Sequence, residues 1–226
     1  MEEWLLLRTD PESAAFNMAV DEALLTRAPE FGQPVLRFYS WSEPAASFGY
    51  FQRYADVARA TTLRPLVRRP TGGGIVPHDH DWTYSVVLPP GHFWYQLKAI
   101  ESYRRIHEWV RTAFAGTGVR AELASEPRRE AAGHCFVGAE RFDVLAQNRK
   151  IAGAAQRRAR HGLLIQGSVQ PPAGVERPAW EDRMCNVAVT NWHVSWSPSP
   201  LPPVVARLAE GLAVNKYGRP EHNERR

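Results

Sequence analysis

The segment from 142 to 169 constrains the fold most, because it holds three strand-like runs joined by very short connections. Phe142–Ala146 and Lys150–Gln156 flank a turn at Gln147-Asn148-Arg149, and Gly162–Val169 follows as a third run. Strands connected by so few residues pair in antiparallel fashion. The segment therefore predicts a β-hairpin extended by a third strand.

Helical and strand-like patterns alternate along the rest of the chain. Apolar residues recur at helical spacing over 13–27 and 95–115, a short helix fits 178–185, and 203–214 predicts a final helix. The remaining strand-like runs are 4–8, 35–39, 46–51, 65–69, 83–88 and 119–123. We expect one α+β domain over 1–226, with a mostly antiparallel sheet and helices packed on one side of it. The charged tail from about 217 is expected to be mobile.

The composition is that of an ordinary globular protein, with 44% hydrophobic and 23% charged residues. No apolar run approaches the roughly 18 residues of a membrane span, and the first residues do not resemble a secretory signal. Two cysteines far apart in the sequence argue against a disulfide framework. We therefore expect a cytoplasmic monomer with no membrane partner, and a net charge of +4 is too modest to indicate nucleic-acid binding.

Lysine is rare in this chain. Its 28 basic residues comprise 25 arginines and only three lysines, Lys98, Lys150 and Lys216. Arginine and lysine are not interchangeable in tight sites, because lysine carries a compact ammonium. Lys150, directly beside Arg149, therefore indicates either a site that needs an ammonium or chance alone, and composition does not decide between them.

A run of three glycines, Gly72, Gly73 and Gly74, follows Arg68, Arg69 and Thr71. Glycines permit positive φ and bring backbone N–H groups close to a ligand. The loop suits a phosphate or an acyl oxygen, although it lacks the closing Gly-Lys-Ser/Thr of a P-loop and the glycine spacing of a dinucleotide site. The alternative is a flexible turn between strands.

The glycine loop leads into His78-Asp79-His80-Asp81. Two histidines at this spacing lie on one face of a strand, as in some metal sites. No further ligand can be placed near them, so we expect no metal. We expect a hydrogen-bonding role for His78 at the end of the loop, and the alternative is a structural or solvated histidine.

Lys150 lies on the second arm of the predicted hairpin, from which it could point back toward Cys135. A cysteine nucleophile needs a positive neighbour, because the thiolate is the reactive form. Strand alternation predicts one face for Lys150, Ala152, Ala154 and Gln156, and the small residues leave room for a substrate chain. The alternative for Cys135 is a small core residue, the role that we assign to Cys185.

Five motifs follow one another along nearly the whole chain. They are FNMAVDEALL (Phe16–Leu25), VLRFYSWSEPAASFGYFQ (Val35–Gln52), RRPTGGGIVPHD with TYSVVLP, Cys135-Phe136 with Phe142-Asp143 and RKIAGAAQRR (Arg149–Arg158), and NKY near the C-terminus. In this order they resemble the biotin/lipoate protein ligase superfamily, and within it the cysteine-dependent octanoyltransferases that modify lipoyl domains. Gly138–Asp143 departs from the Pro-Ser-Tyr-Glu usual in that branch.

The resemblance implies the superfamily's α+β catalytic-domain fold and a transfer of octanoyl or lipoyl groups. The donor would be octanoyl-acyl carrier protein, and the acceptor a lysine of a lipoyl domain such as that of glycine-cleavage H protein. Cys135 would form the acyl thioester, and Lys150 would lower the pKa of the cysteine and position the acyl carbonyl. Glycine backbone N–H groups would stabilise the oxyanion, with no cofactor and no metal. The substrate-binding residues would be Arg68, Arg69, Thr71, Gly72, Gly73, Gly74, His78, Gly153, Ala154, Ala155 and Gln156.

Other functions stay open. A lipoate–protein ligase would use ATP and magnesium and a lysine such as Lys150, but would need no cysteine; Cys135 favours transfer. A biotin ligase fits the glycine loop and its flanks less well. A non-catalytic module that binds acyl-carrier or lipoyl domains would leave both Cys135 and Lys150 dispensable.

Overall fold

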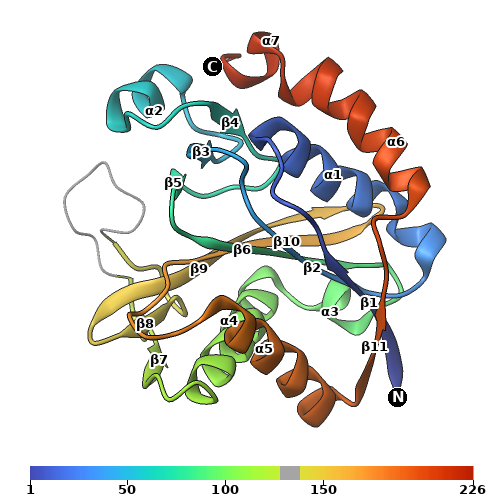
Figure 1. The fold of residues 1–226 in the computed structure, drawn as a ribbon, viewed down its shortest axis with the longest axis vertical. Helices are drawn as coiled ribbons and strands as arrows, with labels where there is room; N and C mark the ends of the chain where they lie inside the picture. The colour runs from blue at the N-terminus through green and yellow to red at the C-terminus, as the bar shows by residue number, and fades with distance from the viewer. Residues whose placement is uncertain (128–137, 226) are drawn as a thin grey trace.

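The computed structural model describes residues 1–127 and 138–225 of the chain. Its centre is an eight-stranded sheet of order β11-β1-β2-β6-β10-β9-β8-β7, and a three-stranded sheet of order β4-β3-β5 lies beside it (Figure 1). Within the described ranges, β1 pairs in parallel with β2 and β11, and the other neighbours in the large sheet are antiparallel. The predicted α+β class is confirmed.

The strands of the large sheet are β1 (Glu2–Arg8), β2 (Val35–Tyr39), β6 (Trp82–Leu88), β7 (Ala121–Leu123), β8 (Val144–Ala146), β9 (Arg149–Ala159), β10 (Gly162–Val169) and β11 (Val194–Pro198). Those of the small sheet are β3 (Ala45–Phe48), β4 (Leu66–Arg68) and β5 (Val76–His78). The helices are α1 (Ala14–Phe31), α2 (Tyr54–Ala60), α3 (Phe93–Gln96), α4 (Ala99–Ala115), α5 (Arg177–Trp192), α6 (Pro203–Leu212), the π-helical η1 (Ala213–Tyr217) and α7 (Pro220–Asn223). Among these described helices, none has the length and apolar character needed to cross a membrane.

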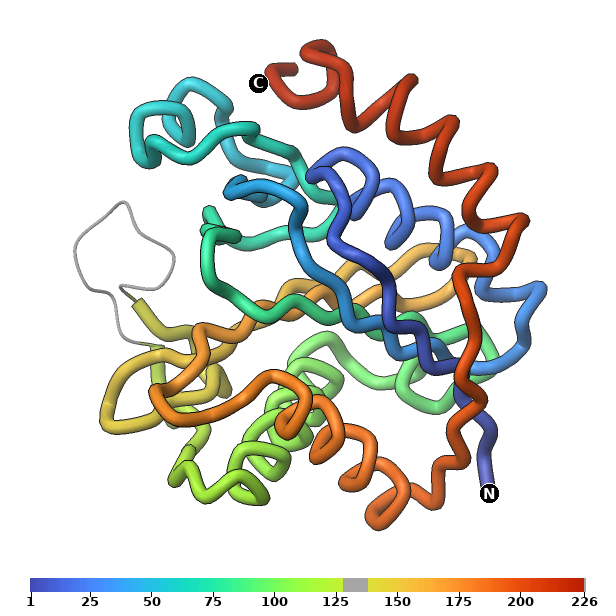
Figure 2. Tube along the Cα trace, in the orientation of Figure 1, coloured from blue at the N-terminus to red at the C-terminus, as the bar shows by residue number. Residues whose placement is uncertain are grey.

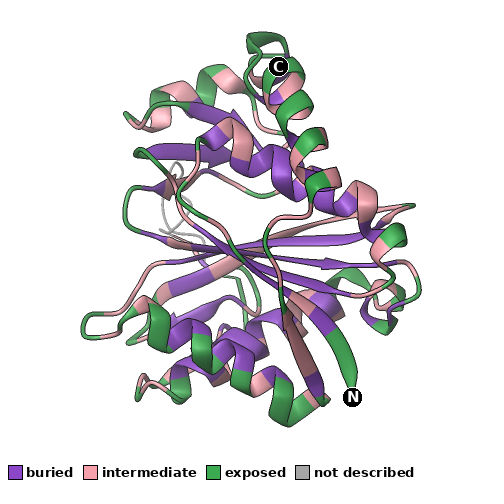
Figure 3. Ribbon diagram, turned by 45° about the vertical axis from the view of Figure 1, so that its right-hand side comes forward, coloured by how far each residue is buried: buried purple, intermediate pink, exposed green. Residues whose placement is uncertain are grey.

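Helices cover both faces of the large sheet, so the expectation of helices on one side was wrong. Helices α1 and α6 pack on one face, whereas α3, α4 and α5 pack on the other (Figure 1). The central strands are buried on both faces, as the purple strands between helices in Figure 3 show. A strand that is covered on both faces reads as a nearly continuous apolar run, whereas a strand covered on one face alternates; β2 and β10 are buried along their whole length.

Helix α1 begins and ends at ordinary capping residues. The Ser13 hydroxyl accepts a hydrogen bond from the Phe16 backbone N–H at 3.3 Å, as the N-cap prediction requires. Gly32, with φ of 65°, ends the helix in the left-handed conformation that glycine adopts without steric cost. Helix α1 lies directly over the strands that border the candidate site.

The predicted hairpin is present, and its turn is tighter than expected. Gln147 and Asn148 both have positive φ, 49° and 64°, which is the signature of a two-residue type I′ turn. Arg149 therefore belongs to β9, where it pairs with Ala146. Asparagine tolerates this conformation better than most residues, and this explains the tight connection.

The C-terminal tail is held by specific contacts, where the sequence suggested mobility. Figure 2 shows the last segment (red) passing along α1 and ending near residues 50–70. His222 is buried, and its Nε2 lies 3.1 Å from the Arg68 carbonyl oxygen. The Asn223 side-chain oxygen accepts a hydrogen bond from the Arg68 backbone N–H at 2.9 Å. The tail thus braces β4, the strand that leads into the glycine loop.

Candidate active site

A β-bulge at the start of β9 sets the direction of the Lys150 side chain. Lys150 pairs with Leu145 but Ala152 pairs with Val144, so Ile151 is an extra residue in β9. An extra residue reverses the alternation of faces beyond it. Lys150 accordingly shares a face with Gly153, so the prediction of one face for Lys150, Ala152, Ala154 and Gln156 holds for the last three and was wrong for Lys150.

Asp143 holds the Lys150 ammonium. Its carboxylate is fully buried, and Oδ2 lies 2.8 Å from Lys150 Nζ, whose side chain is 13% exposed. Asp143 Oδ2 also accepts a hydrogen bond from the Glu140 backbone N–H at 2.7 Å, and Oδ1 accepts one from the Tyr103 hydroxyl at 2.5 Å. Burial and the neighbouring Asp143 charge raise the pKa of Tyr103 well above its usual value, so the phenol stays a donor.

Gly153 makes room for that ammonium. A Cβ atom at position 153 would lie 2.7 Å from Lys150 Cε, 2.9 Å from Lys150 Nζ and 3.3 Å from Asp143 Oδ1. Any side chain would therefore push the lysine away. Ala155 is on the same face of β9, and a Cβ built at Gly73 would be 3.8 Å from its methyl group. The glycine loop thus approaches β9 on the side where Lys150 ends.

The glycine loop is held from several directions. Arg69 donates to the Gly72 carbonyl oxygen through Nη2 at 2.6 Å and through Nε at 3.1 Å. The Tyr50 backbone N–H donates to the Thr71 carbonyl oxygen at 2.9 Å. A Cβ at Gly49 would be 1.9 Å from the Gly73 carbonyl oxygen, so glycine is required there for close backbone contact. Gly72 and Gly74 are partly exposed and Gly73 is exposed.

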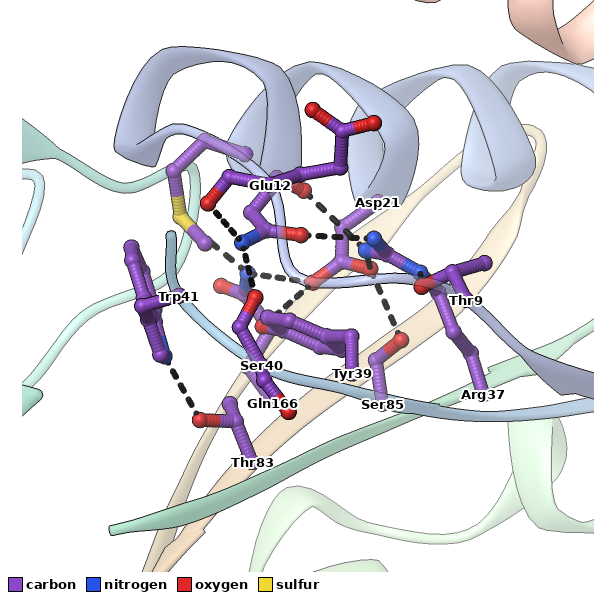
Figure 4. A network of polar contacts seen from close by, with 12 residues as sticks. Thr9, Glu12, Asp21, Arg37, Tyr39, Ser40, Trp41, Thr83, Ser85 and Gln166 are labelled. Atoms are coloured by element: carbon purple, nitrogen blue, oxygen red, sulfur yellow. Dashed lines mark hydrogen bonds and ion pairs between the residues drawn. The ribbon is translucent and has the colours of Figure 1, made fainter. Parts of the chain in front are cut away.

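Thr71 joins the loop to a buried network under α1, and Figure 4 shows the Asp21, Arg37 and Gln166 side chains of that network. Its hydroxyl donates to Gln166 Oε1 at 2.8 Å, and Gln166 Nε2 donates to Asp21 Oδ2 at 2.7 Å. Arg37 Nη1 lies 2.9 Å from Asp21 Oδ1, with both side chains fully buried. The remaining donors to this carboxylate are Tyr39 and Ser85, at 3.1 and 2.8 Å. The floor of the loop is thereby fixed by a fully paired buried charge.

Arg68 braces the chain through backbone carbonyl groups, and the substrate-binding role predicted for it stays a prediction. The residue is fully buried. Its guanidinium donates to the carbonyl oxygens of Tyr50 and Gln52 at 2.9 and 2.7 Å, and to that of Asn223 at 2.8 Å. A guanidinium surrounded by backbone acceptors ties β4 to the C-terminal tail.

His78 takes part in a hydrogen-bonded chain at the end of β5. Its Nδ1 lies 2.9 Å from Asp81 Oδ2, and its Nε2 lies 2.8 Å from Ser47 Oγ. The ring stacks on Trp41 with centroids 3.7 Å apart, and Arg69 Nη1 donates to the same Ser47 Oγ at 3.3 Å. The hydrogen-bonding role predicted for His78 is met by the protein itself, since both ring nitrogens have protein partners.

The Lys150 group and the His78 group border the same face of the large sheet. Gly153 is paired with Ser168, and Ser168 with Thr83, across β9, β10 and β6. Residues in direct register present side chains to one face. The hydroxyls of Ser168 and Thr83 both donate to Asp81 Oδ2, at 2.7 and 3.1 Å. Ser168 and Thr83 thereby connect through Asp81 to the His78 imidazole, and Ser168 lies in register with Gly153, the residue next to the Lys150 ammonium.

Two of the small-residue positions on β9 lie on the opposite face. Ala154 packs against the core under α4. Gln156 Oε1 accepts from Ser102 Oγ at 2.8 Å, and its amide donates to the Ala99 carbonyl oxygen at 2.7 Å. Ala154 and Gln156 therefore belong to the helix-packing side of β9, and the substrate-binding role predicted for them stays a prediction. Gly153 and Ala155 remain on the site face.

Cys135 lies outside the described residues. Cys185 is buried in the core, as predicted, and burial raises the pKa of its thiol to about 11. A thiol of that pKa is unreactive near neutral pH. Residues that the sequence left without a role are Asp143, Tyr103, Gly49 and Gln166. The sequence motif contains Phe142-Asp143, but it does not show that Asp143 pairs with Lys150, because the bulge at Ile151 sets the direction of the lysine.

The chain is similar to proteins of lipoate metabolism. The family model of the lipoyl protein ligase A/B catalytic domain matches residues 13–170. Octanoyltransferase LipM of Exiguobacterium sp. (strain ATCC BAA-1283 / AT1b) is 40% identical over 180 residues, covering 74% of this chain and 65% of that protein. Octanoyltransferase LipM of Oceanobacillus iheyensis is 35% identical, covering 77% and 66%. The match thus spans about two thirds of the length of these relatives.

Solved structures share the fold. Lipoate-protein ligase A bound with ATP has a TM-score of 0.80 at 22% identity, covering 99% of both chains. Ta0514 from T. acidophilum with bound lipoic acid has a TM-score of 0.79 at 23% identity, covering 99% of this chain and all of that one. The arrangement of two sheets flanked by helices is therefore the fold that this chain shares with these structures. The chain belongs to the lipoyl protein ligase A/B catalytic domain family.

Proposed function

We propose that the protein transfers an octanoyl or lipoyl group from acyl carrier protein to a lysine of a lipoyl domain, through a thioester on Cys135. The observation that carries this proposal is the match, at 33–40% identity, to relatives named octanoyltransferase LipM. The placement of the Lys150 ammonium beside the glycine loop supports it. A lipoyl domain, such as that of glycine-cleavage H protein, is the proposed acceptor.

The proposed reaction has two acyl-transfer steps. In the first, the Cys135 thiolate attacks the carbonyl carbon of the octanoyl thioester. The carbon–sulfur bond to the carrier breaks, and the carrier thiol leaves with the proton that Cys135 lost. In the second, the neutral amine of the acceptor lysine attacks the Cys135 thioester, an amide forms, and the proton lost by the amine returns to Cys135. No ATP, cofactor or metal is required.

Lys150 is the group proposed to serve both steps. A nearby ammonium favours the thiolate over the thiol. It also stabilises the negative charge that develops on the acyl oxygen, together with N–H groups of Gly72 and Gly73. His78 is the less suitable proton carrier, because Asp81 and Ser47 occupy its two ring nitrogens.

Intact mass spectrometry tests the proposal. The protein is incubated with octanoyl-acyl carrier protein alone, and we expect a hydroxylamine-labile octanoyl adduct in the wild type and none in Cys135→Ala. Cys185→Ala is the matched control, and it should keep the adduct because Cys185 is buried with a raised thiol pKa.

The same reagents separate the other functions. Modification of a lipoyl domain that needs ATP and survives Cys135→Ala would establish a ligase and contradict the proposal. Absence of both adduct and modification, with retained binding of the carrier, would establish a binding module. The wild type must therefore acylate itself without ATP for transfer to stand.

A further inference from the structure

The family resemblance assigns a role to Lys150 but none to the residues behind it. Asp143 is fully buried and directs both carboxylate oxygens to donors: Oδ2 to Lys150 Nζ and the Glu140 N–H, and Oδ1 to the Tyr103 hydroxyl. A buried carboxylate is stable only when it is paired and hydrogen-bonded. Here every partner is supplied, so the carboxylate is a fixed anchor.

We infer that Asp143, oriented by Tyr103, is the positioning residue that holds the Lys150 ammonium over Gly153 and against the glycine-loop face. The inference rests on the proposed function for its catalytic meaning, but the placement itself does not depend on it. Lysine has four rotatable side-chain bonds and loses considerable entropy when it is held in one position. The ion pair with Asp143 at 2.8 Å compensates part of that entropy loss.

The neighbouring backbone is arranged for this one position. The bulge at Ile151 turns Lys150 to the face of Gly153. The missing side chain of Gly153 accommodates Lys150 Cε and Nζ, which would approach a Cβ there within 2.7 and 2.9 Å. Tyr103 reaches Asp143 from α4, on the other side of the sheet. Three separate elements thus converge on one carboxylate.

The chain contains a second triad of the same chemistry, remote from the glycine loop. Lys216 Nζ lies 2.7 and 2.6 Å from the two carboxylate oxygens of Glu22, and the Tyr217 hydroxyl donates to Glu22 Oε2 at 2.6 Å. This triad fastens η1 to α1. It has lysine, carboxylate and tyrosine but no contact with the loop, so it is a matched internal control. Lys98 is exposed and supplies a mobile reference.

The experiment is nuclear magnetic resonance of the full chain labelled with ¹³C at lysine Cε. Three lysines give three assignable signals. In the wild type we expect restricted motion at Lys150 and Lys216 and free motion at Lys98. Asp143→Asn should release Lys150 to the mobility of Lys98 and leave Lys216 unchanged. Glu22→Gln should do the reverse and leave octanoyl transfer at the wild-type rate.

Kinetics give the second readout. Asp143→Asn should lower kcat by about 100-fold with little change in KM, because a displaced catalytic group acts on the transition state. Tyr103→Phe removes one hydrogen bond to a charged acceptor, and we expect a smaller fall of about tenfold. That variant decides the matter if Asp143→Asn does not fold.

The outcomes separate the two proposals. A Lys150 signal that stays restricted in Asp143→Asn, or in Tyr103→Phe where only that variant folds, overturns the positioning role. Release of Lys150 in the variants, combined with no octanoyl transfer by the wild type, supports the positioning role and refutes the proposed function. Release of Lys150 without any change in kcat overturns the catalytic meaning of the anchor.

Discussion

Gly153→Ala tests the geometry of the site with a single methyl group. The new Cβ would lie 2.7 Å from Lys150 Cε, whereas ordinary contact begins at 3.4 Å. Lys150 Cε must therefore retreat by about 0.7 Å, and the ammonium nitrogen, at 2.9 Å, by about 0.5 Å. Because a misplacement of ~1 Å in a catalytic group can cost about 100-fold in rate, we expect octanoyl transfer to fall by about 10- to 100-fold.

The fold should survive this change. The atoms that the methyl meets are the far end of a flexible lysine, which can move without disturbing the backbone. Replacing glycine by alanine also removes unfolded-state entropy, worth roughly 0.5–1 kcal/mol in favour of folding. We therefore expect a free energy of unfolding within about 1 kcal/mol of the wild type, measured by urea denaturation.

Single-turnover transfer of octanoyl groups, followed by mass spectrometry, is the assay. Gly211→Ala is the control: a Cβ there meets nothing within 4 Å, so α6 should gain about 1 kcal/mol and the rate should not change. If Gly153→Ala transfers octanoyl groups at the wild-type rate, the placement of Lys150 over Gly153 is not needed for catalysis.

Three further predictions concern the support of the site. Burial lowers the pKa of His107 to about 4. The unfolded chain, in which the pKa of this histidine is near 6.5, binds the proton first as the pH falls, so the free energy of unfolding should fall by up to about 3 kcal/mol between pH 6.5 and 4. His107→Gln should flatten this pH profile, measured by urea denaturation. Gly49→Ala should displace the glycine loop, lower the free energy of unfolding by about 1–3 kcal/mol and reduce octanoyl transfer. Gly91→Ala should change neither, because its Cβ meets nothing within 4 Å. Truncation after Gly218 removes acceptors from buried Arg68 and should lower stability by about 1–3 kcal/mol, whereas truncation after 224 should not.

Many of the strands and helices could be predicted because their signals are local, whereas α2, β5 and β11 were missed and α5 is longer than the predicted 178–185. Val35–Tyr39 and Gly162–Val169 have the predicted bounds, and the hairpin lies where its turn residues place it. The helix predicted for 95–115 is two helices, α3 and α4, which meet at an extended residue, Leu97. Apolar periodicity continues across this break, so the sequence does not reveal it.

The site could be predicted only in part, because its geometry depends on register and long-range partners. Lys150 was placed on the wrong face since one extra residue, Ile151, reverses the alternation. Arg68 looked like a ligand-binding arginine beside Arg69, yet its guanidinium donates to the backbone of Tyr50 and Gln52 and to that of Asn223, which lies 155 positions away. No local pattern marks such partners.

The two lysine–carboxylate–tyrosine triads differ in whether an arginine could replace the lysine. At Lys216, the carboxylate of Glu22 meets the ammonium with both oxygens, and the lysine side chain is 30% exposed. Carboxylate oxygens in that arrangement also suit the fork of a guanidinium. Lys216→Arg should therefore keep both the fold and octanoyl transfer.

Lys150 differs, because the space between Gly153 and Asp143 admits only a narrow group. Its Cε and Nζ would lie within 2.9 Å of a Cβ at position 153, and a planar guanidinium is wider than an ammonium. Lys150→Arg keeps the charge but displaces it, so we expect transfer to fall at least as far as in Gly153→Ala. Equal activity of Lys150→Arg and Lys216→Arg in the single-turnover assay would show that charge alone suffices at the site, and that the lysine there reflects chance.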